Sequence, residues 1–177
     1  MAHTHDHHDH DHHSHDHHDH APAAVGAAGE PKLLFPGLQG FYNWAIPLSW
    51  AVVRFAAGFI LFIHGIGKIQ RGMTAQSAQL AKSMPIVEPL GNDFSMFLTF
   101  VELGGGICIM LGLFTRFFAA ANAIEMAVLT FVVYWGNGFG WLNKGYEFTL
   151  MWGILLFAIA LRGGGPYSLD RKLGKEL

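Results

Sequence analysis

The chain has 177 residues, of which 51% are hydrophobic and 14% charged. This composition excludes an intrinsically disordered protein and is unusual for a soluble domain. The formal net charge is −2 with histidine neutral, so the chain lacks the basic excess of a typical nucleic-acid-binding protein. A single cysteine, Cys108, excludes an internal disulfide, a CxxC redox pair and an all-cysteine metal centre built by this chain alone.

Residues 1–20 form a low-complexity tract that alternates histidine with aspartate and holds eleven of the twelve histidines. Because nothing in it can build an apolar core, we expect a disordered tail. Imidazoles and carboxylates at this density bind Zn²⁺, Ni²⁺, Cu²⁺ or Co²⁺ in many geometries, and a solvated, pH-dependent tail is the alternative interpretation. The candidate metal ligands are His3, His5, His7, His8, His10, His12, His13, His15, His17, His18 and His20.

Residues 21–44 are rich in alanine, proline and glycine and predict a linker that leads to the membrane surface. The start of the chain has neither the basic residues nor the short apolar run of a cleavable signal peptide, so we expect none.

Four apolar stretches follow, each close to the roughly 20 residues that a helix needs to cross the hydrocarbon core. They lie at 47–69, 94–114, 117–135 and 146–161. The sequence therefore predicts an all-α integral membrane protein: a four-transmembrane-helix bundle over residues 45–172, followed by a short tail at 173–177. The connection 70–93 is long; its first half predicts a short interfacial helix, and Pro85 and Pro89 are expected to break any helix in its second half.

The charges that flank the spans weakly favour both termini on the cytoplasmic side, because basic residues concentrate there. Six basic residues then lie inside and four outside. The inner group is Lys32, Arg116, Arg162, Arg171, Lys172 and Lys175, and the outer group is Lys68, Arg71, Lys82 and Lys144.

Ionisable side chains inside a bilayer are costly and need a partner or a purpose. Helix depth, counted at 1.5 Å per residue, predicts that Arg54 lies level with Glu125 and pairs with it. It also predicts a polar pocket in the outer half of the bundle, formed by His64, Lys68, Glu102 and Glu147. Three carboxylates face one deep arginine, so at least one glutamate is protonated or paired with Lys68 or His64, which suits proton transfer. Alternatively, these groups only hold helices together, and Glu147 only caps its helix.

Glycine clusters give two further expectations. Gly104, Gly105 and Gly106, with Gly112 later in the same span, predict close helix packing rather than ligand contact. Residues 163–166, Gly-Gly-Gly-Pro, predict the end of the last helix.

Several short motifs together resemble the DoxX family of small four-helix membrane proteins. They are Arg54-x-x-x-Gly58, His64-Gly65-x-x-Lys68, Phe100-Val101-Glu102-x-Gly104-Gly105, Leu111-Gly112-Leu113-x-Thr115-Arg116, Gly145-Tyr146-Glu147 and Gly165-Pro166-Tyr167-Ser168-Leu169-Asp170. The resemblance implies membrane redox chemistry: some members are similar to the small subunit of thiosulfate:quinone oxidoreductase, and others partner soluble enzymes of sulfur or superoxide stress. It also singles out Arg54, His64, Glu102, Arg116 and Glu147.

The leading hypothesis is a bacterial inner-membrane subunit that binds quinone for a partner oxidoreductase. Its catalytic candidates are Arg54, His64, Glu102 and Glu147, and its quinone-binding candidates are Arg54, Glu102, Arg116 and Lys68. Expected partners are the lipid bilayer, an oxidoreductase subunit and further copies of this chain, but no nucleic acid. The alternatives are a non-catalytic membrane scaffold or assembly subunit and metal handling through the histidine-rich tail.

The tail hypothesis predicts that the full-length chain binds several Zn²⁺ or Ni²⁺ ions and that deletion of residues 2–20 removes this binding, because those residues carry the clustered imidazoles. Isothermal titration calorimetry of both proteins checks it. Equal metal uptake by the two proteins would contradict the assignment.

Overall fold

The computed structural model describes residues 34–175, and these are helical with no β-strand. The contacts of the chain divide it into residues 1–36 and 37–177. The predicted histidine-rich tail, and most of the predicted linker, lie outside the described residues. The described part of the second unit forms the helices α1 (Gln39–Arg71), α2 (Met73–Ser83), α3 (Gly91–Leu111), α4 (Thr115–Val128), α5 (Glu147–Arg162) and α6 (Leu169–Leu173).

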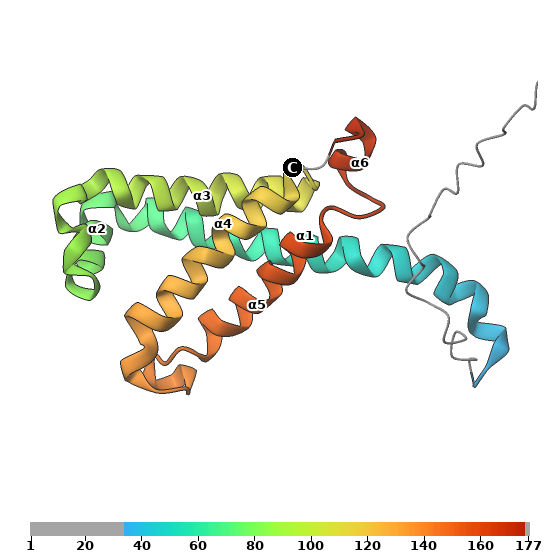
Figure 1. The fold of residues 1–177 in the computed structure, drawn as a ribbon, viewed down its shortest axis with the longest axis horizontal. Helices are drawn as coiled ribbons and strands as arrows, with labels where there is room; N and C mark the ends of the chain where they lie inside the picture. The colour runs from blue at the N-terminus through green and yellow to red at the C-terminus, as the bar shows by residue number, and fades with distance from the viewer. Residues whose placement is uncertain (1–33, 176–177) are drawn as a thin grey trace, which may run out of the picture. The chain divides into compact units, whose positions relative to one another are not determined.

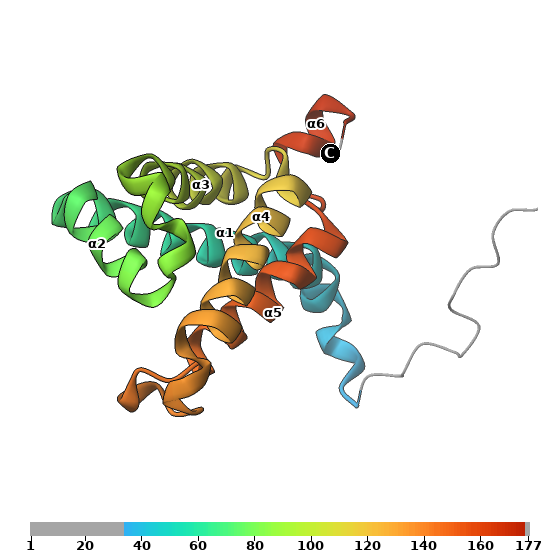
Figure 2. The same ribbon diagram turned by 60° about the vertical axis from the view of Figure 1, so that its left-hand side comes forward.

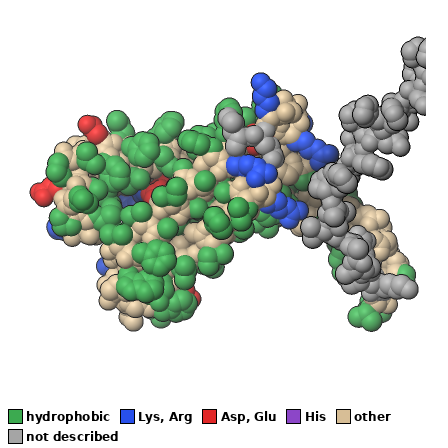
Figure 3. Space-filling view, in the orientation of Figure 1, with side chains coloured by type: hydrophobic (Ala, Val, Ile, Leu, Met, Phe, Trp, Pro, Cys, Tyr) green, Lys and Arg blue, Asp and Glu red, His purple; other side chains and the backbone are tan. Residues whose placement is uncertain are grey.

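Three helical segments are long and apolar enough to cross a membrane: Pro36–Arg71, Pro85–Leu111 and Thr115–Asn137. Their burial pattern is the reverse of that in a soluble protein. Large side chains such as Phe55 and Phe59 are exposed, whereas Arg54 and Glu102 are 2% and 3% exposed. Hydrophobic side chains are spread widely over the surface seen in Figure 3. A surface of this kind is stable in lipid rather than in water, so the protein is a membrane protein.

The fourth predicted span corresponds to α5, which has 16 residues and a length of about 24 Å. It is shorter than the three segments above, so a fourth crossing stays a prediction. Its exposed large side chains still recur every three or four residues along one face, which is typical of a helix that faces an apolar medium. They are Phe148, Met151, Ile154, Phe157 and Leu161.

The helix boundaries differ from the predicted ones near the prolines, which interrupt the helices less than the sequence predicts. Helix α1 begins at Gln39, so residues 39–44 are helical rather than part of a linker, and Pro47 lies inside the helix. A membrane helix tolerates an internal proline because other groups satisfy the freed backbone carbonyl. Residues Pro85–Leu90 form a 3₁₀ helix that leads directly into α3. The predicted short helix after the first span is confirmed as α2.

The long helices pack as two pairs, α1 with α3 and α4 with α5, and the pairs diverge toward the end that carries α2 (Figures 1 and 2). Small residues bring the first pair together. A Cβ atom placed on Gly58 would lie 2.5 Å from the carbonyl oxygen of Gly106, and one on Gly106 would lie 2.7 Å from that of Gly58. The predicted close packing is therefore confirmed at Gly106, whereas Gly104 meets only the ring of Phe100, at 3.6 Å.

A second contact region, which we call the C-terminal clamp, joins Arg54 and Asp170 to the α3–α4 turn. Arg54 donates from Nη1 to the carbonyl oxygens of Ile109 (2.9 Å) and Met110 (3.2 Å) and from Nη2 to that of Tyr167. The Asp170 carboxylate accepts from the N–H groups at 114 (2.7 Å) and 115 (3.0 Å) and from the Thr115 hydroxyl (2.8 Å). The carbonyls of Ile109 and Met110 lie in the last turn of α3 and the two N–H groups lie at the start of α4, where a helix end leaves backbone groups without the usual intrahelical partners. Tyr167 lies in the segment between α5 and α6.

Backbone geometry in the clamp depends on glycine at position 112, which has a φ of +71°. A Cβ atom here would lie 2.1 Å from Arg54 Nη1 and 2.5 Å from the Cβ of Ser168. The sequence run 163–166 ends α5 at Arg162 as predicted, and so returns the chain to Asp170.

Gly106→Ala should destabilise the protein by about 1–3 kcal/mol, because the added methyl group meets backbone atoms that cannot move aside independently. Thermal unfolding in detergent measures the change. Gly104→Ala is the matched control in the same helix and should leave the unfolding midpoint nearly unchanged, so equal shifts in both variants would contradict the packing argument.

Asp170→Asn should lower stability by about 1–3 kcal/mol, since one carboxylate oxygen is replaced by an NH₂ group, which cannot accept a hydrogen bond from an N–H group at the start of α4. Asp93→Asn, at an exposed carboxylate in the first turn of α3, supplies the comparison. A variant at position 170 that unfolds no earlier than the Asp93 variant would show that the clamp contributes no stability.

Candidate functional site

A cavity of about 690 Å³ is lined by residues of α1, α2, α3, α4 and α5 and of the segment that joins α4 to α5. Much of its wall is apolar, including Ile60, Leu98 and Met126, and Phe148 and Trp152 form an edge-to-face aromatic pair on the α5 side. Its volume is that of a pocket for a small organic molecule.

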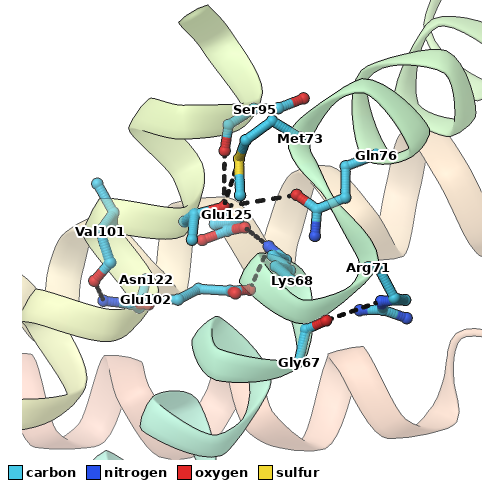
Figure 4. Close-up of polar contacts among 11 residues, drawn as sticks. Gly67, Lys68, Arg71, Met73, Gln76, Ser95, Val101, Glu102, Asn122 and Glu125 are labelled. Atoms are coloured by element: carbon cyan, nitrogen blue, oxygen red, sulfur yellow. Dashed lines mark hydrogen bonds and ion pairs between the residues drawn. The ribbon is translucent and has the colours of Figure 1, made fainter. Parts of the chain in front are cut away.

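Three charged residues in this cavity form what we call the Lys68 triad. Lys68 Nζ lies 2.7 Å from Glu102 Oε1 and 3.2 Å from Glu125 Oε1 (Figure 4). The residues come from α1, α3 and α4, and both carboxylates are buried, with Glu102 3% and Glu125 8% exposed. One ammonium faces two carboxylates, so the triad has an excess of one negative charge when both glutamates are ionised.

Close packing of α1 against α3 brings the residues of the triad together. Gly65 lies three residues before Lys68 on α1, and a Cβ atom there would lie 2.9 Å from the Cβ of Leu103. This close approach of α1 to α3 puts Lys68 beside Glu102, the residue before Leu103. Helix α4 reaches the same place at an angle to α1 and α3 (Figures 1 and 2) and supplies Glu125.

Four buried polar atoms of cavity-lining residues have no hydrogen-bond partner among the described residues. They are Glu102 Oε2, Glu125 Oε2, Ser95 Oγ and Trp152 Nε1. A buried polar atom without a partner costs about 1–3 kcal/mol, so native structures rarely keep several together without a use. Two acceptors, one donor and one hydroxyl in a single cavity indicate a binding site for a ligand with polar groups.

The structure brings three of the predicted site residues to this cavity. Lys68 and Glu102 are members of the triad, and His64 lines the cavity one turn earlier on α1, where it is exposed. Glu147 does not line the cavity. It lies in the first turn of α5 and accepts from the backbone N–H of Trp141 at 3.2 Å, which belongs to the segment before the helix rather than to α5 itself.

The predicted pairing of Arg54 with Glu125 is wrong, because Glu125 pairs with Lys68. Lys68 follows Arg54 by 14 residues on α1, or about 21 Å. The depth count assumed upright helices, whereas α4 runs at an angle to α1 (Figure 1). Arg54 lies in the C-terminal clamp, and Arg116 donates to the carbonyl oxygens of Leu161 (2.6 Å) and Ala160 (3.4 Å) at the end of α5. Neither arginine lines the cavity.

The sequence did not single out Glu125, Ser95 and Trp152 as site residues. Glu125 is recognisable in the sequence as an ionisable residue within a span, but the depth count pairs it with Arg54 instead of Lys68. Ser95 and Trp152 carry no such signal, because serine and tryptophan are common in membrane helices and only the cavity distinguishes them.

Within residues 34–175, no group of three or more His, Cys, Asp or Glu side chains is arranged to hold a metal ion. The predicted metal ligands of the histidine-rich tail lie outside these residues.

Comparison with known proteins supports the family resemblance that the sequence motifs indicate. Residues 49–135 match the model of the DoxX family, and this segment contains the whole Lys68 triad. A Haemophilus influenzae protein, named only as an uncharacterized protein, is 27% identical over 136 residues, which cover 73% of this chain and 94% of that protein. No solved structure matches. Residues 49–135 of this membrane protein thus match a DoxX domain.

Proposed function

We propose that this protein is a membrane subunit of a quinone-linked oxidoreductase system and that its cavity binds the quinone headgroup. The observation that carries the proposal is the set of buried, unpartnered polar atoms in a cavity inside an apolar, lipid-facing bundle. A ligand that enters such a cavity from the lipid is lipid-soluble and must also offer polar groups. A quinone combines both properties in one molecule.

The chemistry of the wall fits this ligand. Lys68 Nζ retains an N–H beyond its two ion pairs, and Trp152 Nε1 has a free donor, so carbonyl oxygens have partners on the α1 and α5 sides. The aromatic pair of Phe148 and Trp152 offers an edge for a flat ring. Reduction of a quinone takes two electrons and two protons. Glu102 and Glu125 hold and pass protons, His64 at the exposed rim exchanges them with water, and a partner subunit supplies the electrons.

We propose that α5 is the fourth span, so that both termini lie on the cytoplasmic side of a bacterial inner membrane. Support comes from the apolar outer face of α5 and from the basic residues that gather near α6 (Figure 3), among them Arg171 and Lys172. Arg54, Arg116 and Glu147 then have structural roles at helix ends.

Leu98→Trp tests the binding site, because Leu98 lines the cavity and an indole there takes the space of the ligand. Bound quinone, extracted from the purified native protein and counted by mass spectrometry, should fall at least tenfold. Met96→Trp is the matched control two residues earlier on α3, where the side chain is 59% exposed, and it should retain quinone.

Two outcomes would reject the proposal. One is a wild-type protein that carries no quinone and does not bind added decylubiquinone saturably, and the other is equal quinone content in both tryptophan variants. The scaffold alternative predicts that a partner protein is retained while quinone is absent. The metal alternative predicts that deletion of residues 2–20 abolishes the function of the protein. A quinone site predicts that quinone-reducing activity is unchanged by this deletion.

A further inference from the structure

The end of the bundle that carries α6 is where the apolar segments stop. Helix α3 ends here and α4 begins here, and both belong to segments that are long and apolar enough to cross a membrane. Trp50 donates from Nε1 to the carbonyl oxygen of Gly163 at 3.0 Å, just past the end of α5. Tryptophan is enriched at the boundary between membrane and water. This end of the bundle therefore lies at the level of the lipid headgroups.

An open basin of about 410 Å³ lies beside α6 at this end. We call it the α6 basin; it is lined by Gly165, Pro166, Asp170, Arg171, Gly174 and Lys175. Its volume is within the range of pockets for small ligands. None of its lining residues lines the cavity of the Lys68 triad, so the two sites are separate.

The side chains that the α6 basin offers to a ligand are cationic. Arg171 and Lys175 are exposed, and neither forms an ion pair within residues 34–175. Asp170 is 2% exposed, and its carboxylate already accepts three hydrogen bonds in the C-terminal clamp. The sequence from 162 to 177 holds one other acid, Glu176, and Lys172 adds a further exposed cation. The described wall thus presents two cationic donors to an anion and no free carboxylate.

The clamp fixes the backbone that carries these cations. The N–H of Asp170 donates to the carbonyl oxygen of Gly112 at 2.8 Å. The hydroxyl of Ser168 accepts from the N–H of Arg171 at 3.2 Å and donates to the carbonyl oxygen of Gly165 at 2.8 Å. Because this backbone is ordered before a ligand arrives, binding costs less conformational entropy than it would on a flexible tail.

Apolar side chains in the same segment favour a lipid over a soluble anion. Tyr167 is 54% exposed and Leu173 is 64% exposed, on either side of Arg171 in the sequence. Tyrosine is favoured at the headgroup level of a bilayer, where its ring meets apolar matter and its hydroxyl meets water. A lipid brings acyl chains that cover such side chains, whereas a soluble phosphate ester leaves them in water.

We propose that the α6 basin binds the phosphate-bearing headgroup of an anionic phospholipid, with Arg171 and Lys175 as the binding residues. A guanidinium can hold two phosphate oxygens at once, and the ammonium adds a second positive charge. A zwitterionic headgroup carries its own ammonium, which these two cations repel. The bound lipid ties the C-terminal segment, and through the clamp the α3–α4 turn, to the bilayer surface. The proposal does not depend on the quinone site.

Native mass spectrometry of the full chain in detergent, titrated with phosphatidylglycerol or with phosphatidylcholine of the same acyl chains, tests the proposal. We expect the wild-type protein to bind phosphatidylglycerol at least tenfold more tightly. The double variant Arg171→Gln, Lys175→Gln should bind both lipids equally, because each basic residue near anionic lipid contributes about fivefold in affinity. Unchanged phosphatidylcholine binding by this variant shows that it is folded.

The matched control is the double variant Lys82→Gln, Lys172→Gln. It removes the same charge at two exposed residues that do not line the basin, and it should keep the preference for phosphatidylglycerol. A competition with glycerol 3-phosphate separates the two sources of a phosphate group. This soluble ester at millimolar concentration should leave phosphatidylglycerol bound.

Each opposite result would overturn the proposal. Equal affinity of the wild-type protein for the two lipids would show that the basin does not select anionic headgroups. An equal loss of preference in both double variants would reduce the effect to diffuse surface charge. Displacement of phosphatidylglycerol by glycerol 3-phosphate would assign the basin to a soluble phosphate ester instead of a lipid.

Discussion

The bilayer offers no hydrogen bonds, so every polar group inside this bundle must find its partner within the protein or in a ligand. That constraint explains the burial pattern, in which arginine and glutamate lie inside while phenylalanine faces outward. It also makes each buried charge informative, because a charge without a partner costs more in lipid than at a protein surface in water.

Two polar centres meet the constraint in different ways. In the C-terminal clamp, both oxygens of Asp170 have partners, and the guanidinium of Arg54 binds three backbone carbonyls through Nη1 and Nη2 while its Nε has no partner among the described residues. Those partners come from the end of α3, the start of α4 and Tyr167, so the clamp connects α1, α3, α4 and the C-terminal segment. In the Lys68 triad, each carboxylate keeps one oxygen without a partner beside a cavity. The first centre accounts for structure, and the second leaves room for a ligand.

Some residues of the family motifs lie in the C-terminal clamp and others lie along the cavity. Arg54, Gly112, Thr115 and Asp170 meet in the clamp, whereas His64, Lys68 and Glu102 lie along the cavity. A motif residue in this chain is therefore not by itself a binding residue. Gly58 and Gly65 serve both centres indirectly, since they bring α1 close enough to α3 for Arg54 and Lys68 to reach their partners.

The sequence by itself determined the helical class, the membrane environment, the approximate positions of the apolar helices and the identity of the ionisable residues among them. These follow from hydropathy and composition, which are local properties of the chain. Only the tertiary structure decided that Glu125 pairs with Lys68 rather than Arg54, that Arg54 and Arg116 bind helix-end carbonyls, and that Ser95 and Trp152 line the cavity. The physical reason is the tilt between the two helix pairs, because residues at equal calculated depth meet only when their helices stand parallel, and no local pattern in the sequence encodes that angle.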